Sequence, residues 1–272
     1  MHDLLSTYPP IVWIALLVAG IVIGLLAGLL GVGGGLVAVP VLFEVFAAID
    51  IPETTAVPLT IGTAHACILI TSLTAALAHW RAGTIDRPLV RSWLPAMAFG
   101  AAVGLTLGSF APAKLLTGGF AAVAAVLAVK MALGEHLFSM RKPLKGAGTH
   151  VAAWLVGVLA SSVGVGGGTL STPVLSMFSF PIRRAIGAGS LFNLLIALPA
   201  AVTFLSAGWS MPDRPADSVG EVAVLCVATL SLPALFVAPM AAHWSAHAPV
   251  VILRRLFAVC LAAVAVRMLL RL

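Results

Sequence analysis

Apolar residues fill ten segments of the chain, which glycine, proline or charged residues separate. The segments are 11–30, 36–49, 56–79, 89–111 and 113–134, followed by 151–163, 169–180, 185–207, 222–243 and 250–270. Their Ala, Leu and Val runs lack the two-residue alternation of a membrane β-barrel, so the pattern predicts an all-α bundle of membrane helices. The third, fourth and fifth segments of each group of five are long enough to cross a hydrocarbon core of about 30 Å.

The segments that flank two glycine runs are shorter, most clearly 36–49, 151–163 and 169–180. At a rise of about 1.5 Å per residue, they reach only part-way across a bilayer. Three consecutive glycines break a helix, and broken helices at membrane depth are tolerated only where they line a cavity or are buried in protein. The pattern therefore predicts half-helices that meet at the glycines, where we expect the working site.

The two glycine runs belong to an internal repeat. Gly-Val-Gly-Gly-Gly at 31–35 recurs at 164–168, and Val-Pro-Val-Leu at 39–42 is matched by Thr-Pro-Val-Leu at 172–175. We therefore predict a first membrane repeat at 1–134, a short cytoplasmic linker at 135–150 and a second membrane repeat at 151–272. Each repeat would hold a glycine-broken pair followed by three transmembrane helices.

Composition agrees with this picture, because 61% of the residues are apolar, 9% are charged and the mean hydropathy is +1.14. If each broken pair enters the membrane and returns to its own side, the two repeats are inverted and both termini are extracytoplasmic. Ten of the 15 Lys and Arg residues then lie in cytoplasmic loops and three lie outside, as the positive-inside rule requires. Parallel repeats would break that rule. The net charge of +6 is thus interpreted as topogenic rather than as a sign of an anionic partner.

Several functional classes are excluded. Cys67, Cys226 and Cys260 are isolated in apolar segments, so neither a disulfide nor a metal site is expected. No nucleophile–base set, GxSxG or HExxH motif is present, which argues against an enzyme. No full span contains Asp or Glu, which weakens a cation carrier. No cofactor and no nucleic-acid partner are expected.

Half-helices starting at Leu36 and Thr169 would point their free N–H groups and the positive ends of their dipoles at the membrane midplane. Two such ends can hold an anion, and glycines allow its close approach. The alternative is close helix packing by small residues, which we favour for Gly24, Gly28 and Gly157. The candidate substrate-binding residues are Gly33, Gly34, Gly35, Leu36, His65, Gly166, Gly167, Gly168, Thr169, Ser190 and Asn193.

Two of these candidates carry polar side chains with alternative roles. His65 is an ionisable residue well inside a predicted span, so protonation could attract an anion and couple transport to protons near its unperturbed pKa of about 6.5. A neutral histidine that bonds between helices is the alternative. Asn193 needs partners in an apolar segment, and is interpreted as functional or as a link between helices.

The doubled glycine run with its downstream proline, together with the His-x-Arg-x-Gly-x-Ile-Asp sequence at 79–86, resembles the sulfite exporter family of TauE/SafE-like permeases. The resemblance implies a secondary transporter of small sulfur-containing anions, such as sulfite, sulfoacetate or other organosulfonates, in the bacterial inner membrane. His79, Arg81 and Asp86 match the family pattern at the cytoplasmic rim, where a gate or structural ion pair is expected. Ser190 resembles the small hydroxyl residue expected of the family, and the first repeat has His65 at that position.

The expected partners are a small anion and the lipid bilayer, with protons as a candidate coupling ion. An anion channel and a transporter of a different small carboxylate or oxyanion remain alternatives. Either a monomer or a homodimer is compatible with the sequence.

Overall fold

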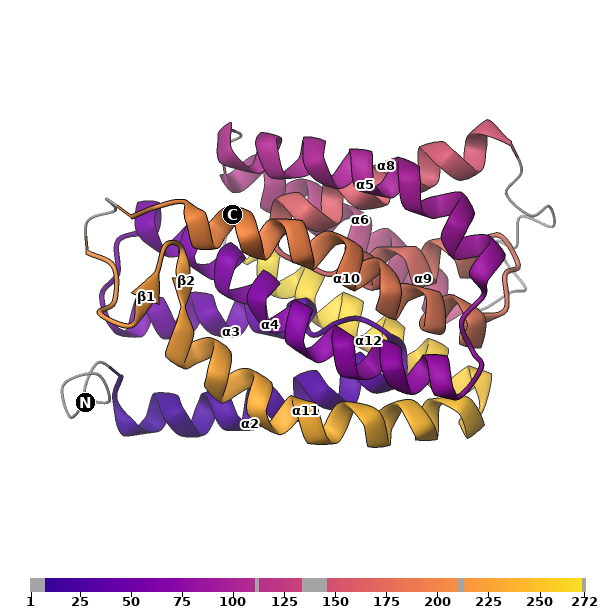
Figure 1. Ribbon diagram of the computed structural model, residues 1–272, viewed down its shortest axis with the longest axis horizontal. Coiled ribbons are helices and arrows are strands. Elements are labelled where there is room, and N and C mark those ends of the chain that lie inside the picture. Colours follow the sequence, from indigo (N-terminus) through magenta and orange to yellow (C-terminus); the bar gives the residue numbers. More distant parts are fainter. Residues whose placement is uncertain (1–7, 111–112, 134–145, 210–212, 271–272) are drawn as a thin grey trace.

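A computed structural model describes residues 8–110, 113–133, 146–209 and 213–270. Within them the chain forms ten helices and one short hairpin (Figure 1). The first five helices are α2 (Pro10–Leu30), α3 (Gly35–Ala48), α4 (Glu53–Arg81), α5 (Arg87–Phe110) and α6 (Ala113–Leu133). The next five are α8 (Ala147–Val163), α9 (Gly167–Met177), α10 (Ile182–Ser206), α11 (Val224–His247) and α12 (Val250–Leu269). Most of the predicted linker lies outside the described residues.

The all-helical prediction is confirmed except for the hairpin, in which β1 (Ser218–Val219) pairs antiparallel with β2 (Val222–Ala223). Its two-residue turn depends on Gly220, whose φ of +59° is readily accessible to glycine. The hairpin lies against the end of α10, because the Glu221 N–H donates to the Phe204 carbonyl over 2.9 Å. This insertion between α10 and α11 is too short and irregular for an alternation pattern to reveal.

Five helices are long and apolar enough to cross a membrane: α2, α4, α5, α10 and α11. The prediction that the segments flanking the glycine runs are too short to cross a bilayer is wrong for α2, whose 21 residues are long and apolar enough to span. The shorter α3, α8 and α9, with 14, 17 and 11 residues, agree with it. α6 and α12, which were also predicted to span, are not among the five, and α12 carries Arg254, Arg255 and Arg267.

The helices run between two ends of the molecule. At the hairpin end, Tyr8 just before α2 donates to the Asp217 carboxylate over 3.0 Å, and Arg267 near the end of α12 pairs with Glu44 near the end of α3. At the opposite, basic end, Arg184 pairs with Asp86 over 3.4 Å and Arg183 donates to the Ala248 carbonyl. The α2–α3 pair thus begins and finishes at the hairpin end. The α8–α9 pair begins and finishes at the basic end, where Gly146, Leu175 and Asp86 line one pocket.

The helices of the two halves interlock. α2 packs along α11 and α8 packs along α5, and glycines allow both close approaches. A Cβ on Gly24 would lie 2.9 Å from the Ala234 Cα, and a Cβ on Gly157 would lie 2.9 Å from the Ala101 backbone nitrogen. α4 and α10 cross the centre (Figure 1), where two thirds of each span is buried. The outer faces of the spans expose large apolar side chains, such as Phe99 and Phe236, as a lipid environment requires.

Candidate functional site

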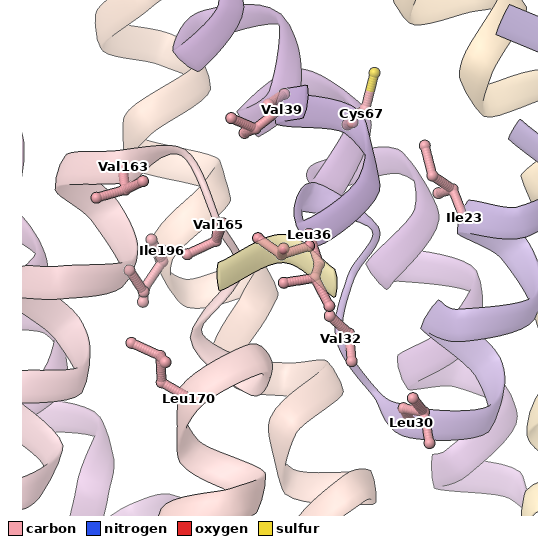
Figure 2. Close-up of a cluster of buried hydrophobic side chains, with 14 of the residues drawn as sticks. Ile23, Leu30, Val32, Leu36, Val39, Cys67, Val163, Val165, Leu170 and Ile196 are labelled. Carbon is pink, nitrogen blue, oxygen red and sulfur yellow. The ribbon is translucent and has the colours of Figure 1, made fainter. Parts of the chain in front are cut away.

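The two glycine runs, far apart in sequence, lie against each other in the centre of the molecule. A Cβ on Gly35 would lie 2.8 Å from the Gly164 carbonyl oxygen, and a Cβ on Gly168 would collide with the Gly31 carbonyl oxygen. Residues 31–36 and 161–173 are all buried. Figure 2 shows Leu36, which directly follows the first run, beside Val165 of the second. In this conformation the predicted site is closed to both ends of the molecule.

The backbone of these runs explains their composition. Gly33, Gly34 and Gly164 have φ values of +72°, +86° and +83°, which side-chain-bearing residues rarely adopt. They turn the chain sharply enough for a new helix to begin at once. α3 begins at Gly35 and α9 at Gly167, one and two residues before the starts predicted at Leu36 and Thr169.

Side chains from other helices bind the carbonyl groups of the first run and of the end of α2. The donors belong to α4, α9, α10 and α11, so most of the core takes part. His79 Nε2 bonds to Gly28, Ser245 Oγ to Leu29, Asn193 Nδ2 to Gly31, Thr169 Oγ1 to Val32 and Thr71 Oγ1 to Gly33, over 2.8 to 3.2 Å. The carbonyl oxygens at this break therefore have protein donors as partners.

The backbone N–H groups at the end of the first run and at the start of α3 are unpaired among the described residues. In the described part of the chain, the backbone N–H groups of Gly34, Gly35 and Leu36 make no hydrogen bond to protein. The next two, of Val37 and Ala38, bond to the Gly34 carbonyl over 3.1 and 2.9 Å. The start of α3 is therefore a buried group of unpaired donors with the positive end of a helix dipole behind it.

The start of α9 is only partly open. The Gly168 N–H donates to Asn193 Oδ1 over 2.7 Å, and the Thr169 N–H donates to the Gly166 carbonyl over 3.0 Å. Asn193 thus bonds to both glycine runs, through its amide oxygen to Gly168 and through its amide nitrogen to Gly31 over 2.8 Å. This places Asn193 in the role of a link between helices, one of the two roles expected for it.

Comparisons with known proteins bear directly on this arrangement. The model of the family described as sulfite exporter TauE/SafE matches residues 16–268. The chain belongs to this family. A probable membrane transporter protein of Haemophilus influenzae is 31% identical over 260 residues, which cover 94% of this chain and 97% of the relative. A second, of Methanocaldococcus jannaschii, is 22% identical over 81% of this chain and 82% of its own length. No solved structure matches.

The protein is therefore a multi-pass membrane transporter of the TauE/SafE family and not an enzyme. Within the described residues, no group of three or more His, Cys, Asp or Glu side chains is arranged to hold a metal ion.

His65 and Ser190, which the sequence pairs by repeat position, do not form one site in this transporter. His65 is fully buried, donates from Nδ1 to the Ile61 carbonyl over 2.9 Å and stacks on Phe204 near the end of α10. Its Nε2 finds no partner among the described residues. Ser190, nearer the start of α10, donates to the Gly187 carbonyl of its own helix over 2.7 Å. The Ser190 hydroxyl is thus used locally, as serine in a helix often is.

The three residues predicted at the cytoplasmic rim, His79, Arg81 and Asp86, have different surroundings in the structure. His79 is buried and joins α4 to α2, because its Nδ1 lies 3.0 Å from Thr84 Oγ1 and its Nε2 bonds to the Gly28 carbonyl. Asp86 caps the start of α5 through the Leu89 N–H and pairs with Arg184. Arg81 is exposed. The partner of Asp86 is on α10, too far away in the sequence for the residue pattern to predict the pair.

One face of α4 contacts both glycine runs, and the sequence did not predict it. Ile61 contacts Gly164, Ile68 contacts Gly35 and Ser72 contacts Gly33. Positions 61, 65, 68 and 72 repeat at helical spacing and therefore share one face. Extending that spacing from His65 would have found Ser72, and the neighbouring Thr71 binds the Gly33 carbonyl.

Proposed function

We propose that this protein is a secondary transporter of a small sulfur-containing anion, such as sulfite, sulfoacetate or another organosulfonate, in the bacterial inner membrane. The observation that carries the proposal is the buried start of α3, next to the start of α9, where three consecutive N–H groups have no partner among the described residues. An anion there would complete the hydrogen bonding of α3 and meet the positive end of its dipole. The apolar surroundings strengthen that attraction by excluding water.

We further infer that the two halves are inverted repeats. Their contacts come in matched pairs: Ile61 with Gly164 and Ile186 with Gly31, Ile68 with Gly35 and Asn193 with Gly168, α2 with α11 and α8 with α5. The broken pairs return to opposite ends, which also supports inversion. Because the site is closed in this conformation, transport requires opening to one end at a time, as in carriers with inverted repeats.

Purified protein in liposomes is expected to take up sulfite or sulfoacetate with saturation and counterflow. Sulfonates should compete with uptake and amines should not, because the site offers donors and a positive dipole without a buried carboxylate in the spans. A pH gradient across the liposome tests protons as the coupling ion, with His65 as the candidate proton site. Flux that neither saturates nor shows counterflow would identify a channel, and equal competition by an amine would contradict the anion assignment.

Both termini are expected outside the cytoplasm. In the structure, α2 begins and α12 ends at the hairpin end, while the basic loops lie at the other end, which the positive-inside rule assigns to the cytoplasm. A reporter active only outside the cytoplasm should work when fused after Leu272 and fail when inserted in the linker at 135–150. The reverse pattern would refute the orientation.

A further inference from the structure

We propose that Ser72 is the side chain that donates to the transported anion, and that the anion is held at the start of α3 rather than equally between the two helix ends. This rests on the proposed anion transport and specifies its binding site. The ligand class is a compound with a terminal oxyanion, such as sulfite or a sulfonate.

Ser72 is a fully buried hydroxyl without a partner. Its exposed fraction is 0%, and Oγ makes no hydrogen bond within the described part of the protein. The two neighbouring threonines are used: Thr71 donates to the Gly33 carbonyl, and Thr169 donates to the Val32 carbonyl. A buried hydroxyl without a partner is costly. The hydroxyls of Thr60, Ser171 and Ser231 also lack a partner among the described residues, so it is the position of Ser72 beside the start of α3 that points to a ligand.

The hydroxyl lies where α3 begins. Ser72 Oγ is 2.8 Å from the position that a Cβ on Gly33 would occupy, and Gly33 leads directly into the open N–H groups of Gly34 and Gly35. Asn193 Nδ2 lies on the same side, 2.6 Å from that position. Only one of its two N–H bonds is used, by the Gly31 carbonyl. Backbone, hydroxyl and amide donors therefore converge at the start of α3.

No buried acid opposes an anion there. Among the described residues, the only buried carboxylate is that of Asp217, which accepts hydrogen bonds from Tyr8 and the Leu225 N–H at the hairpin end. The surroundings of the site are apolar, as Figure 2 shows for Val32, Leu36 and Val165. A set of donors without a buried acid favours an oxyanion over a cation.

The second half does not repeat the Ser72 donor. If Gly62 is matched with Gly187 and His65 with Ser190, the counterpart of Ser72 is Ala197, which cannot donate. The Gly168 N–H is already bonded to Asn193. Among the described residues, the N–H groups of Gly166 and Gly167 and the Ser171 hydroxyl of α9 also make no hydrogen bond. The asymmetry therefore lies in the three consecutive unpaired N–H groups of α3 and in the Ser72 hydroxyl that faces them from α4.

Binding of sulfite and of sulfoacetate to purified protein, measured by calorimetry in detergent, tests this inference. Ser72→Ala is expected to weaken binding roughly tenfold or more, because a hydrogen bond to a charged group is lost. Ser72→Cys carries a weaker donor of similar size, so its affinity for the anion should lie between that of Ser72→Ala and that of the wild type. Without ligand, Ser72→Ala should keep the wild-type Tm, because no protein hydrogen bond is removed. The matched control is Ser231→Ala, which removes a buried hydroxyl on α11 and should leave binding unchanged.

The outcomes separate the two claims. If the wild type binds these anions and Ser72→Ala binds them equally well, the Ser72 site is wrong and the proposed transport stands. A lower Tm of unliganded Ser72→Ala with unchanged affinity would make Ser72 a structural residue, which also overturns the inference. If the wild type binds neither anion in calorimetry and takes up neither in liposomes, the proposed function itself fails.

Discussion

Replacing Gly168 by alanine is expected to abolish transport and to lower stability by about 1–3 kcal/mol, the usual cost of forcing extra atoms into a packed core. A Cβ at this position would collide with the Gly31 carbonyl oxygen and lie 2.8 Å from the Gly189 carbonyl oxygen. Both neighbours are backbone atoms of other segments, so neither can rotate away as a side chain could. The start of α9 would have to move away from the first glycine run.

Thermal unfolding in detergent and uptake into liposomes measure the two effects of Gly168→Ala. The matched control is Gly119→Ala in α6, where a Cβ would meet nothing within 4 Å. Alanine is favoured over glycine inside a helix by about 0.5–1 kcal/mol, so this control should keep or slightly raise the Tm. Normal uptake by Gly168→Ala would show that the two runs need not touch for transport.

The sequence was sufficient to predict the helical bundle, the short α3 and α9 and the break at each glycine run. These features depend on local chemistry, because apolar length fixes a span and consecutive glycines end a helix. The predicted starts of α3 and α9 lie one and two residues after the observed ones, because glycine can occupy the first helical position as well as the turn before it. The prediction of half-helices on both sides of each glycine run does not hold for α2, which has 21 residues where α8 has 17.

Most of the hydrogen bonds that hold the site could not be predicted. Thr71 donates both to Cys67 in its own helix and to Gly33 across the core, and only the first of these bonds is a local event. Ser245 and His79 bind the end of α2 from more distant parts of the sequence. Such partners are fixed by the packing of α4 and α11 on α2, which a single sequence does not specify.

The asymmetry of the site is also a tertiary property. Asn193 lies where the repeat match places Ile68 in the first half, and this difference is visible in the sequence. Its consequence is not, because the amide bonds to Gly168 in its own half and to Gly31 in the other. The amide that the sequence suggests as a ligand is thus chiefly the bridge that holds both runs together.

Replacing Asn193 by alanine is expected to cause the largest loss of stability in the site. The change leaves the buried Gly31 carbonyl and the buried Gly168 N–H without partners, at about 1–3 kcal/mol for each group. Transport should be lost as well, because both helix starts lose a fixed position. Ser190→Ala is the matched control, since Ser190 bonds only within α10. An unchanged Tm and uptake rate for Asn193→Ala would show that helix packing alone holds the runs.

Asn193→Asp separates the bridging role of this side chain from the electrostatics of the site. The carboxylate can still accept from the Gly168 N–H, but it cannot donate to the Gly31 carbonyl unless it is protonated. When ionised, it places a negative charge beside the open donors of α3, in surroundings where charge repulsion is weakly screened. We therefore expect Asn193→Asp to retain more stability than Asn193→Ala and to bind sulfite or sulfoacetate more weakly than the wild type, with the deficit shrinking as pH falls. Calorimetry across pH measures this, and wild-type affinity for the anion at neutral pH in Asn193→Asp would place the anion elsewhere.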